Sequence, residues 1–122
     1  MITKASTVGI YVSDQDRALD FYVNKLGFEK LIDEPMGSGA RWIEVAPAGA
    51  QTHLVLFTPP GQEDRIGTFS NVVFGCDDMR RTHAELAGRG VRFSQEPSIE
   101  PWGTWAQFKD PDGNEFGLIE RS

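Results

Sequence analysis

One short pattern occurs twice in this chain, and the repeat constrains the fold more than any other feature. Each copy has a β-branched strand, an aspartate, a helical pattern and a glycine stop. The copies are 63 residues apart, from Asp14 to Asp77 and from Gly27 to Gly90. Glycine ends helices because it adopts the left-handed conformation at little cost. We therefore predict an α+β fold made of two β-α-β-β-β modules.

The first module is expected at about 1–58. Ser13, with Asp16 three residues later, is close to a capping box and indicates a helix start. Ala18, Tyr22 and Leu26 then recur at helical spacing. Strands are expected on either side of this helix, from β-branched and aromatic composition and from alternation, at 8–12, 28–32, 41–45 and 52–58.

The second module is expected at about 70–122, after a linker at about 59–69 that is rich in proline and glycine. Asp77 or Asp78 is predicted to cap its helix. Met79, His83 and Leu86 fall on one face of that helix, so a packed, hydrogen-bonded histidine is expected there. The strands are expected at 71–76, 91–94, 104–108 and 115–119. We interpret the whole chain, 1–122, as a single domain.

Charge and cysteine usage exclude several classes of function. The chain has 122 residues and a formal net charge of −6, with no cluster of basic residues for binding nucleic acid. The single cysteine, Cys76, excludes an internal disulfide. No signal pattern precedes residue 7, and no apolar run approaches the roughly 20 residues that span a membrane. We expect a cytoplasmic protein that binds neither nucleic acid nor membrane.

Several short motifs together resemble the vicinal oxygen chelate superfamily, which includes glyoxalase I, the bleomycin-resistance proteins and extradiol dioxygenases. The resemblance covers nearly the whole chain and implies that each module curls its sheet into half of a cup. It also implies that two modules, often from two chains of a dimer, close one cavity. The motifs are VSD at 12–14, RALDFY at 17–22, LGF at 26–28, DDM at 77–79, EL at 85–86, RGV at 89–91, PWG at 101–103, DPDGN at 110–114 and LIE at 118–120.

The resemblance also implies where metal ligands would stand. Metal-using members place His, Gln or Glu near the first and last strand of each half, and here these positions are Thr7, Val55, Asn71 and Gly117. Valine and glycine have no side-chain donor, and threonine and asparagine are weak neutral ligands. A shift of one residue in a strand would turn every side chain to the opposite face. We predict no usual metal and no other cofactor, although a metal held by other residues stays open.

Two further residues are candidates for polar contacts or acid–base chemistry. If Leu54 and Leu56 face the helix, then His53, Val55 and Phe57 face the cavity. Glu115 shares a strand face with Gly117. His53 and Glu115 are therefore weak catalytic candidates, and the alternative for each is a residue exposed near a strand end. Glu44 is similar, but alternation alone does not decide which face it takes.

Aromatic residues are candidates for the wall of a binding cleft. Trp42, Trp102 and Trp105 offer surfaces for a planar or cationic ligand, and the alternative is ordinary packing. Tyr11 shares a face with Thr7 and is also expected to point inward.

We therefore predict a protein that binds or sequesters a small organic ligand in an aromatic cleft, similar in kind to the bleomycin-resistance proteins. One alternative is a metal-dependent lyase, isomerase or dioxygenase, so the question of enzymatic activity stays open. The other is a non-catalytic dimeric interaction module. A homodimer is expected in all three cases, because a half-open cup exposes apolar sheet. Neither the ligand nor the location of the cavity, within one chain or across a dimer, follows from the sequence.

Overall fold

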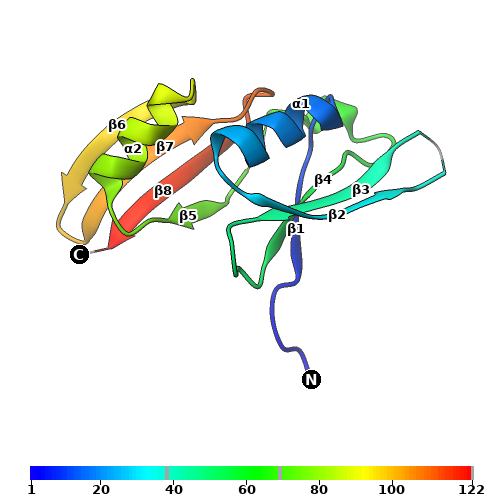
Figure 1. Ribbon diagram of the computed structural model, residues 1–122, viewed down its shortest axis with the longest axis horizontal. Helices are drawn as coiled ribbons and strands as arrows, with labels where there is room; N and C mark the ends of the chain where they lie inside the picture. The colour runs from blue at the N-terminus through cyan, green and yellow to red at the C-terminus, as the bar shows by residue number, and fades with distance from the viewer. Residues whose placement is uncertain (38, 69, 122) are drawn as a thin grey trace. The chain divides into compact units, whose positions relative to one another are not determined.

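The computed structural model describes residues 1–37, 39–68 and 70–121, and Ser38 and Phe69 of the expected turn and linker lie outside that range. The chain divides into two compact units, Met1–Ile66 and Gly67–Ser122 (Figure 1). Within the described residues each unit has one four-stranded sheet. In this part of the chain, no helix is long and apolar enough to cross a membrane.

The first unit begins with β1 (Thr7–Ile10), and the order of its elements is the predicted one. A helix follows as α1 (Gln15–Leu19) and continues as a wider π-helix, η1 (Asp20–Lys25). The strands β2 (Glu29–Pro35), β3 (Arg41–Ala46) and β4 (His53–Leu56) come next, and a short 3₁₀ turn, η2 (Glu63–Arg65), ends the unit. The sheet order is β1-β4-β3-β2, with β1 parallel to β4 and the other pairs antiparallel.

The second unit repeats this arrangement. Its elements are β5 (Val73–Gly75), α2 (Met79–Gly88), β6 (Arg92–Glu100), β7 (Gly103–Lys109) and β8 (Glu115–Arg121). The sheet order is β5-β8-β7-β6, again with one parallel pair, β5 and β8. The two β-α-β-β-β modules and the α+β class predicted from the sequence are therefore confirmed.

Each helix starts at an aspartate. The carboxylate of Asp14 accepts a hydrogen bond from the backbone N–H of Arg17 at 3.1 Å, and Asp78 accepts from Arg81 N–H at the same distance. These bonds satisfy backbone donors that have no partner inside the helix. The prediction of Ser13 as the first cap was wrong, because its neighbour holds the position with extended φ and ψ. For the second helix the cap is Asp78, the second of the two alternatives.

The glycines after the helices adopt the conformation that the sequence suggested. Gly27 has φ of 82° and Gly90 has φ of 91°. This left-handed region is accessible to glycine without the steric penalty that a Cβ brings. The chain therefore leaves each helix at these residues and enters the next strand.

One face of each sheet packs on its own helix (Figure 1). In the first unit, alternate residues of β3 and β4 are buried with apolar side chains of the helix. In the second unit, the buried side chains come from α2, β7 and β8. These core residues are Ile43, Val45, Leu54, Leu56, Ala18, Phe21 and Tyr22 in the first unit and Met79, Leu86, Ala106, Phe108, Phe116 and Leu118 in the second.

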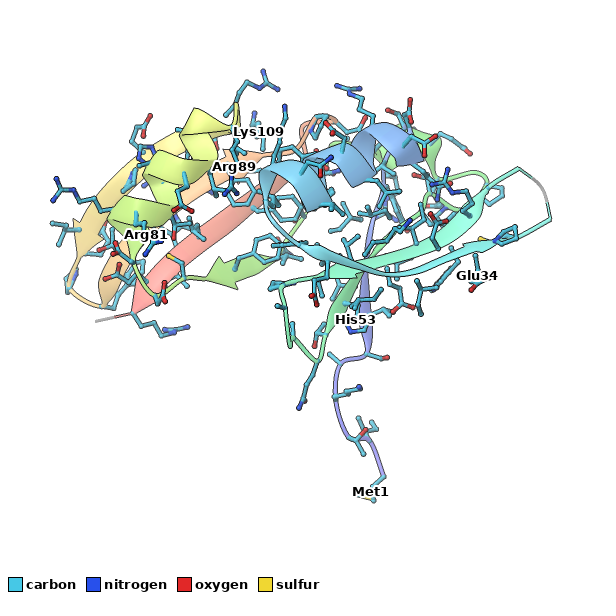
Figure 2. All side chains as sticks on the ribbon, viewed as in Figure 1. Met1, Glu34, His53, Arg81, Arg89 and Lys109 are labelled. Carbon is cyan, nitrogen blue, oxygen red and sulfur yellow. The ribbon has the colours of Figure 1, made fainter. Side chains whose placement is uncertain are left out.

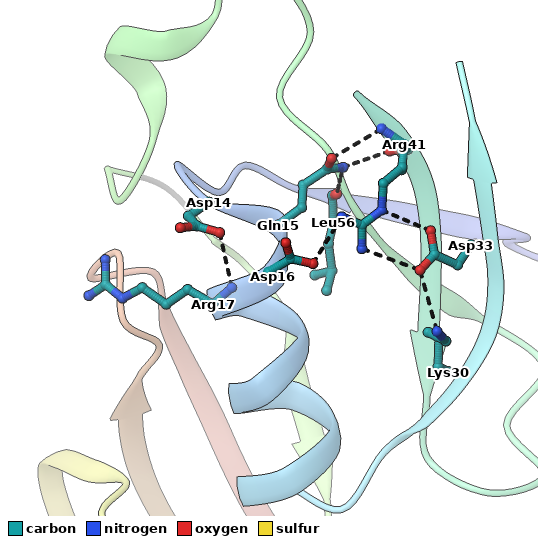
Figure 3. Close-up of polar contacts among 8 residues, drawn as sticks. All are labelled: Asp14, Gln15, Asp16, Arg17, Lys30, Asp33, Arg41 and Leu56. Carbon is teal, nitrogen blue, oxygen red and sulfur yellow. Dashed lines mark hydrogen bonds and ion pairs between the residues drawn. The ribbon is translucent and has the colours of Figure 1, made fainter. Parts of the chain in front are cut away.

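Hydrogen bonds and ion pairs fix the start of α1 on its sheet (Figure 3). The Gln15 side chain donates to the carbonyl oxygens of Arg41 at 2.6 Å and Leu56 at 2.8 Å, and it accepts from Arg41 N–H at 3.1 Å. The Arg41 guanidinium then pairs with Asp16 at 2.9 Å and with Asp33 at 3.0 Å. The hydrogen bond from Arg41 holds the pKa of Asp33 below its ordinary value.

The strand boundaries differ most from the prediction at β6, which was expected at 91–94 but extends over nine residues. Its later part contains Pro97 and has irregular pairing on both sides of Gln95. As an edge strand, β6 pairs only with β7, and a proline without an N–H is tolerated in such strands. Composition therefore ended the predicted strand too early. Conversely, the strand expected at 52–58 is only His53–Leu56.

Candidate functional site

Strand register determines which candidate residues share a face. We call the side of each sheet turned away from its own helix its far face. In the first sheet, Thr7 pairs with His53, while Gly9 and Glu44 both pair with Val55. Paired residues point the same way across neighbouring strands, so these side chains lie together on the far face of the first sheet.

A hydrogen-bonded chain of three side chains lies on this face. Trp42 donates its indole N–H to Glu44 Oε2 at 2.8 Å, and His53 Nδ1 lies 2.7 Å from Glu44 Oε1. Burial raises the pKa of Glu44, but the hydrogen bonds from Trp42 and His53 outweigh it and hold that pKa below its ordinary value. Figure 2 shows His53 on the side of the sheet away from α1.

Aromatic side chains flank these three hydrogen-bonded residues. The rings of Trp42 and Phe57 have centroids 6.2 Å apart. The Tyr11 ring lies beside Gly9, where a Cβ would come within 3.8 Å of Tyr11 Cε1. Val55, in β4, is buried, with 4% of its surface exposed. The first sheet thus gathers Thr7, Tyr11, Trp42, His53, Val55 and Phe57 on one side, as the alternation of its strands indicated for most of them.

The far face of the second sheet carries a different group. The Trp105 ring lies directly over Gly117, and a Cβ built on that glycine would come within 2.3 Å of Trp105 Cη2. Trp102 meets Trp105 edge to face, with centroids 6.1 Å apart and an interplanar angle of 74°. Trp102 is half exposed, at 48%. Glycine is required at 117 because the indole occupies the place of a side chain.

A polar hollow of about 360 Å³ adjoins the same sheet. Asn71, Lys109 and Glu115 line it, together with small residues of the segment before β5. Lys109 and Glu115 are paired across β7 and β8, and Glu115 accepts from Gln107 Nε2 at 3.4 Å. Asn71 itself lies just before β5 and is exposed, although the sequence suggested that it opened the strand.

The structure gives the two weak catalytic candidates separate partners. His53 is held by Glu44 in the first unit, and Glu115 interacts with Gln107 in the second. His83 packs on Phe93 with centroids 4.5 Å apart and pairs with Glu96, as predicted for a packed histidine. Across residues 1–37, 39–68 and 70–121, no three His, Cys, Asp or Glu side chains converge closely enough to hold a metal ion.

The sequence reasoning did not assign Glu44, Gln107 or Lys109 to the site. A signal was present in the repeat, because 63 residues separate Trp42 from Trp105 and also separate Glu44 from Gln107. The same spacing relates Asp14 and Asp77. Applying this period to the third strand of each module would have placed both tryptophans and their polar neighbours on corresponding faces.

Comparison with known proteins identifies the family. The model of the Glyoxalase/Bleomycin resistance protein/Dioxygenase superfamily matches residues 4–118. The chain belongs to this superfamily. The vicinal oxygen chelate assignment made from the motifs is therefore confirmed. An uncharacterized superfamily relative, YetH of Bacillus subtilis, is 42% identical over 120 residues, covering 98% of this chain and 100% of YetH.

Solved structures extend the comparison. TnmS3, an antibiotic binding protein from Streptomyces sp. CB03234, is 41% identical with a TM-score of 0.88, covering 99% of this chain and 98% of TnmS3. A superfamily member from Sphaerobacter thermophilus is 38% identical with a TM-score of 0.91, covering 98% of both chains. These proteins share both the fold and a substantial part of the sequence of this superfamily member.

Proposed function

We propose that this superfamily member binds a small organic molecule against the tryptophans of its second sheet and does so without the usual metal. The observation that carries the proposal is the Trp105 ring over Gly117. This ring fills the position at which metal-using relatives are expected to place a ligand. With Trp102 set edge to face, it forms an aromatic corner suited to a flat ring.

The four expected ligand positions do not fit a metal. Val55 has no donor atom, and Gly117 is covered by the indole of Trp105. Thr7 and Asn71 offer only neutral oxygens, which suit neither zinc nor the redox metals. The function proposed here therefore includes no step through a metal.

The comparisons support binding of a small molecule. TnmS3 is described as an antibiotic binding protein and is 41% identical over nearly the whole chain. The character of the ligand follows from the site: indole faces bind flat, apolar or cationic rings, and about 1 kcal/mol accompanies each good aromatic contact. We propose sequestration of such a molecule as the role of the protein.

Tryptophan fluorescence tests this proposal. Titration with a panel of flat aromatic molecules should quench the emission and give saturable binding in the micromolar range. Trp105→Leu should abolish that binding. Phe93→Leu removes an aromatic ring from the helix side of the same sheet and should leave it intact. Equal binding by wild type and Trp105→Leu would refute the proposed site, and no binding by wild type would refute the function.

Metal independence has its own test. Ligands that bind only the folded state raise the melting temperature, so added Ni, Zn, Mn, Fe and Mg ions should cause no shift. Elemental analysis of protein purified without chelator should find less than one metal per chain. A stoichiometric metal with a clear shift would favour the enzyme alternative instead.

We also propose that the protein is a homodimer. Two apolar side chains are exposed on the far face of the second sheet: Val73 at 50%, which pairs with Gly117, and Trp102 at 48%, which contacts Trp105. Exposed apolar groups favour association when they lie together on a surface. Sedimentation velocity should give the mass of two chains, and a monomer at micromolar concentration would refute this proposal. The cytoplasmic location stays a prediction.

A further inference from the structure

A carboxylate lies at the same end of the second sheet as the two tryptophans. In the hairpin of β6 and β7, Ser98 pairs with Trp105 (Figure 1). Glu100 pairs with Gly103 at the end of the hairpin, and Trp102 lies in the turn between them. Paired residues point the same way, so Ser98 and Glu100 share the far face with Trp105. Both indoles and the carboxylate thus belong to one hairpin of the second unit.

The Glu100 carboxylate is held at one of its two oxygens. Ser98 donates its hydroxyl to Glu100 Oε1 at 3.1 Å and accepts from Gln95 Nε2 at 3.4 Å. In the described part of the chain, no other hydrogen bond and no ion pair of Glu100 is found. Its pairing partner Gly103 has no side chain that could cover it. The second oxygen is therefore open to a group on a bound molecule.

The charge of this carboxylate is not balanced by a neighbouring cation. Arg121 stands in the same row of the sheet, because Gly103 pairs with both Glu100 and Arg121. Two strand spacings, roughly 10 Å, separate the backbones of the two charged residues. The formal net charge of −6 also favours the approach of cations to this protein. The electrostatic surroundings thus favour a positively charged ligand at this end of the face.

The fold itself does not require Glu100 and Trp102 at this end of the hairpin. In the first module, Gly37 and Gly39 stand 63 residues before them, between the strands that correspond to β6 and β7. The first unit therefore connects these strands with neither a carboxylate nor an indole at the two positions. Trp102 also stays 48% exposed, although burial of apolar surface is favourable. An exposed indole beside an unpaired carboxylate suits the binding of a cation.

We propose that Glu100 recognises the positive charge of a flat aromatic cation that binds against Trp102 and Trp105. The inference rests on the proposed binding function and names the chemical class of its ligand. A cation is attracted by a carboxylate and also by the face of an indole ring. The hairpin presents both groups side by side. Ser98 positions the carboxylate, and the contact involves no covalent step.

A matched pair of probes tests the contact. 2-Methylisoquinolinium and 2-methylnaphthalene have nearly the same shape, and the first carries a fixed positive charge that does not depend on pH. Calorimetric titration of the full chain at low ionic strength should show about ten-fold tighter binding of the cation, with about three-fold each from the carboxylate and the indoles. Added salt should reduce this preference, because it screens the charges.

Two glutamines separate the carboxylate from the general charge of the protein. Glu100→Gln should reduce the preference for the cation to about three-fold, the part that comes from the indole rings. Glu96→Gln is the matched control, because Glu96 lies on the same strand but pairs with His83 of α2. It removes the same charge from the chain and should leave the preference at about ten-fold.

The outcomes distinguish this inference from the proposed function. Equal affinity of wild type for the two probes, with binding that still requires Trp105, would overturn the inference and leave the proposed function standing. The same holds if Glu100→Gln and Glu96→Gln have equal effects on the preference. If neither probe nor any other flat aromatic molecule binds wild type, the proposed function fails and the inference fails with it.

Discussion

Replacing Gly117 by alanine tests the packing that distinguishes the second sheet. A Cβ at this position would lie 2.3 Å from Trp105 Cη2, 2.9 Å from Cζ2 and 3.0 Å from Cζ3. Ordinary contacts begin at 3.4 Å, so the edge of the ring would have to move by the difference, about 1.1 Å. The backbone of Gly117 is not in the left-handed region, so the conflict comes from the indole alone.

The magnitude of the effect follows from overpacking. Inserting one methyl group into a filled site costs about 1–3 kcal/mol. For a chain of this length, 1 kcal/mol changes the melting temperature by about 4 °C, so Gly117→Ala should lower it by about 4–12 °C. Displacement of the ring should also shift the tryptophan emission and weaken binding of flat ligands.

Gly75→Ala is the matched control. Gly75 lies in β5 of the same sheet, its φ is also outside the left-handed region, and a Cβ there would meet nothing within 4 Å. Alanine should be neutral or slightly stabilising at this position, because glycine in a strand costs about 0.5–1 kcal/mol relative to alanine.

A double-mutant cycle isolates the contact between Gly117 and Trp105. Trp105→Phe removes the six-membered part of the indole, including the three atoms that meet the new methyl group. Gly117→Ala should therefore cost much less stability in the Trp105→Phe background than in wild type, with a coupling of about 1 kcal/mol or more. If Gly117→Ala is as mild as Gly75→Ala and leaves the emission unchanged, the ring does not lie over Gly117 and the reasoning is wrong.

Three further predictions concern a helix–sheet contact, a helix cap and an ion pair between strands. Gln15→Leu removes three hydrogen bonds to the backbone of Arg41 and Leu56 and should cost about 2–3 kcal/mol in urea unfolding; a loss below about 0.5 kcal/mol would refute the role of this side chain. Asp78→Ala removes the cap of α2 and should cost about 1 kcal/mol, which thermal melts of the variant and wild type will check. Because Arg41 lowers the pKa of Asp33 in the folded state, this carboxylate stabilises the fold above its ordinary pKa of 3.8, and that contribution is lost as pH falls through the lower folded value. In thermal melts at matched ionic strength, the melting temperature of wild type should therefore fall more than that of Asp33→Asn between pH 5 and strongly acidic pH. Identical curves of melting temperature against pH for the two proteins would contradict the ion pair.

The repeat made most of the fold predictable from the sequence. Helical periodicity and glycine stops depend on local chemistry, so the helix made of α1 and η1, the helix α2, and the glycines Gly27 and Gly90 that follow them could be predicted. The extent of β6 could not, because its second part is extended through pairing with β7 rather than through its own composition. Ser13 was preferred to Asp14 as a cap because both residue types favour that position and only backbone geometry separates them.

Only some residues of the candidate site could be predicted from the sequence, and their contacts could not. Alternation placed His53 and Val55 together, since one residue always separates side chains on one face of a strand. In β3 both alternate sets contain apolar residues, Trp42 on one face and Ile43 on the other, so the sequence did not decide where Glu44 points. That choice depends on which set packs against the helix, which is a tertiary property.

The two units differ in the contacts that their corresponding tryptophans, Trp42 and Trp105, make. Val55 pairs with Glu44, and Gly117 pairs with Gln107. Trp42 and Trp105 each lie two residues before that pairing residue, so both tryptophans occupy the same position in the repeat. In the second sheet Gly117 leaves space, and the ring of Trp105 covers it. In the first sheet the side chain of Val55 occupies the corresponding space, and Trp42 instead donates its N–H to Glu44. The residue at this position of the repeat thus decides whether the neighbouring tryptophan covers the sheet, as Trp105 does, or donates to a carboxylate, as Trp42 does.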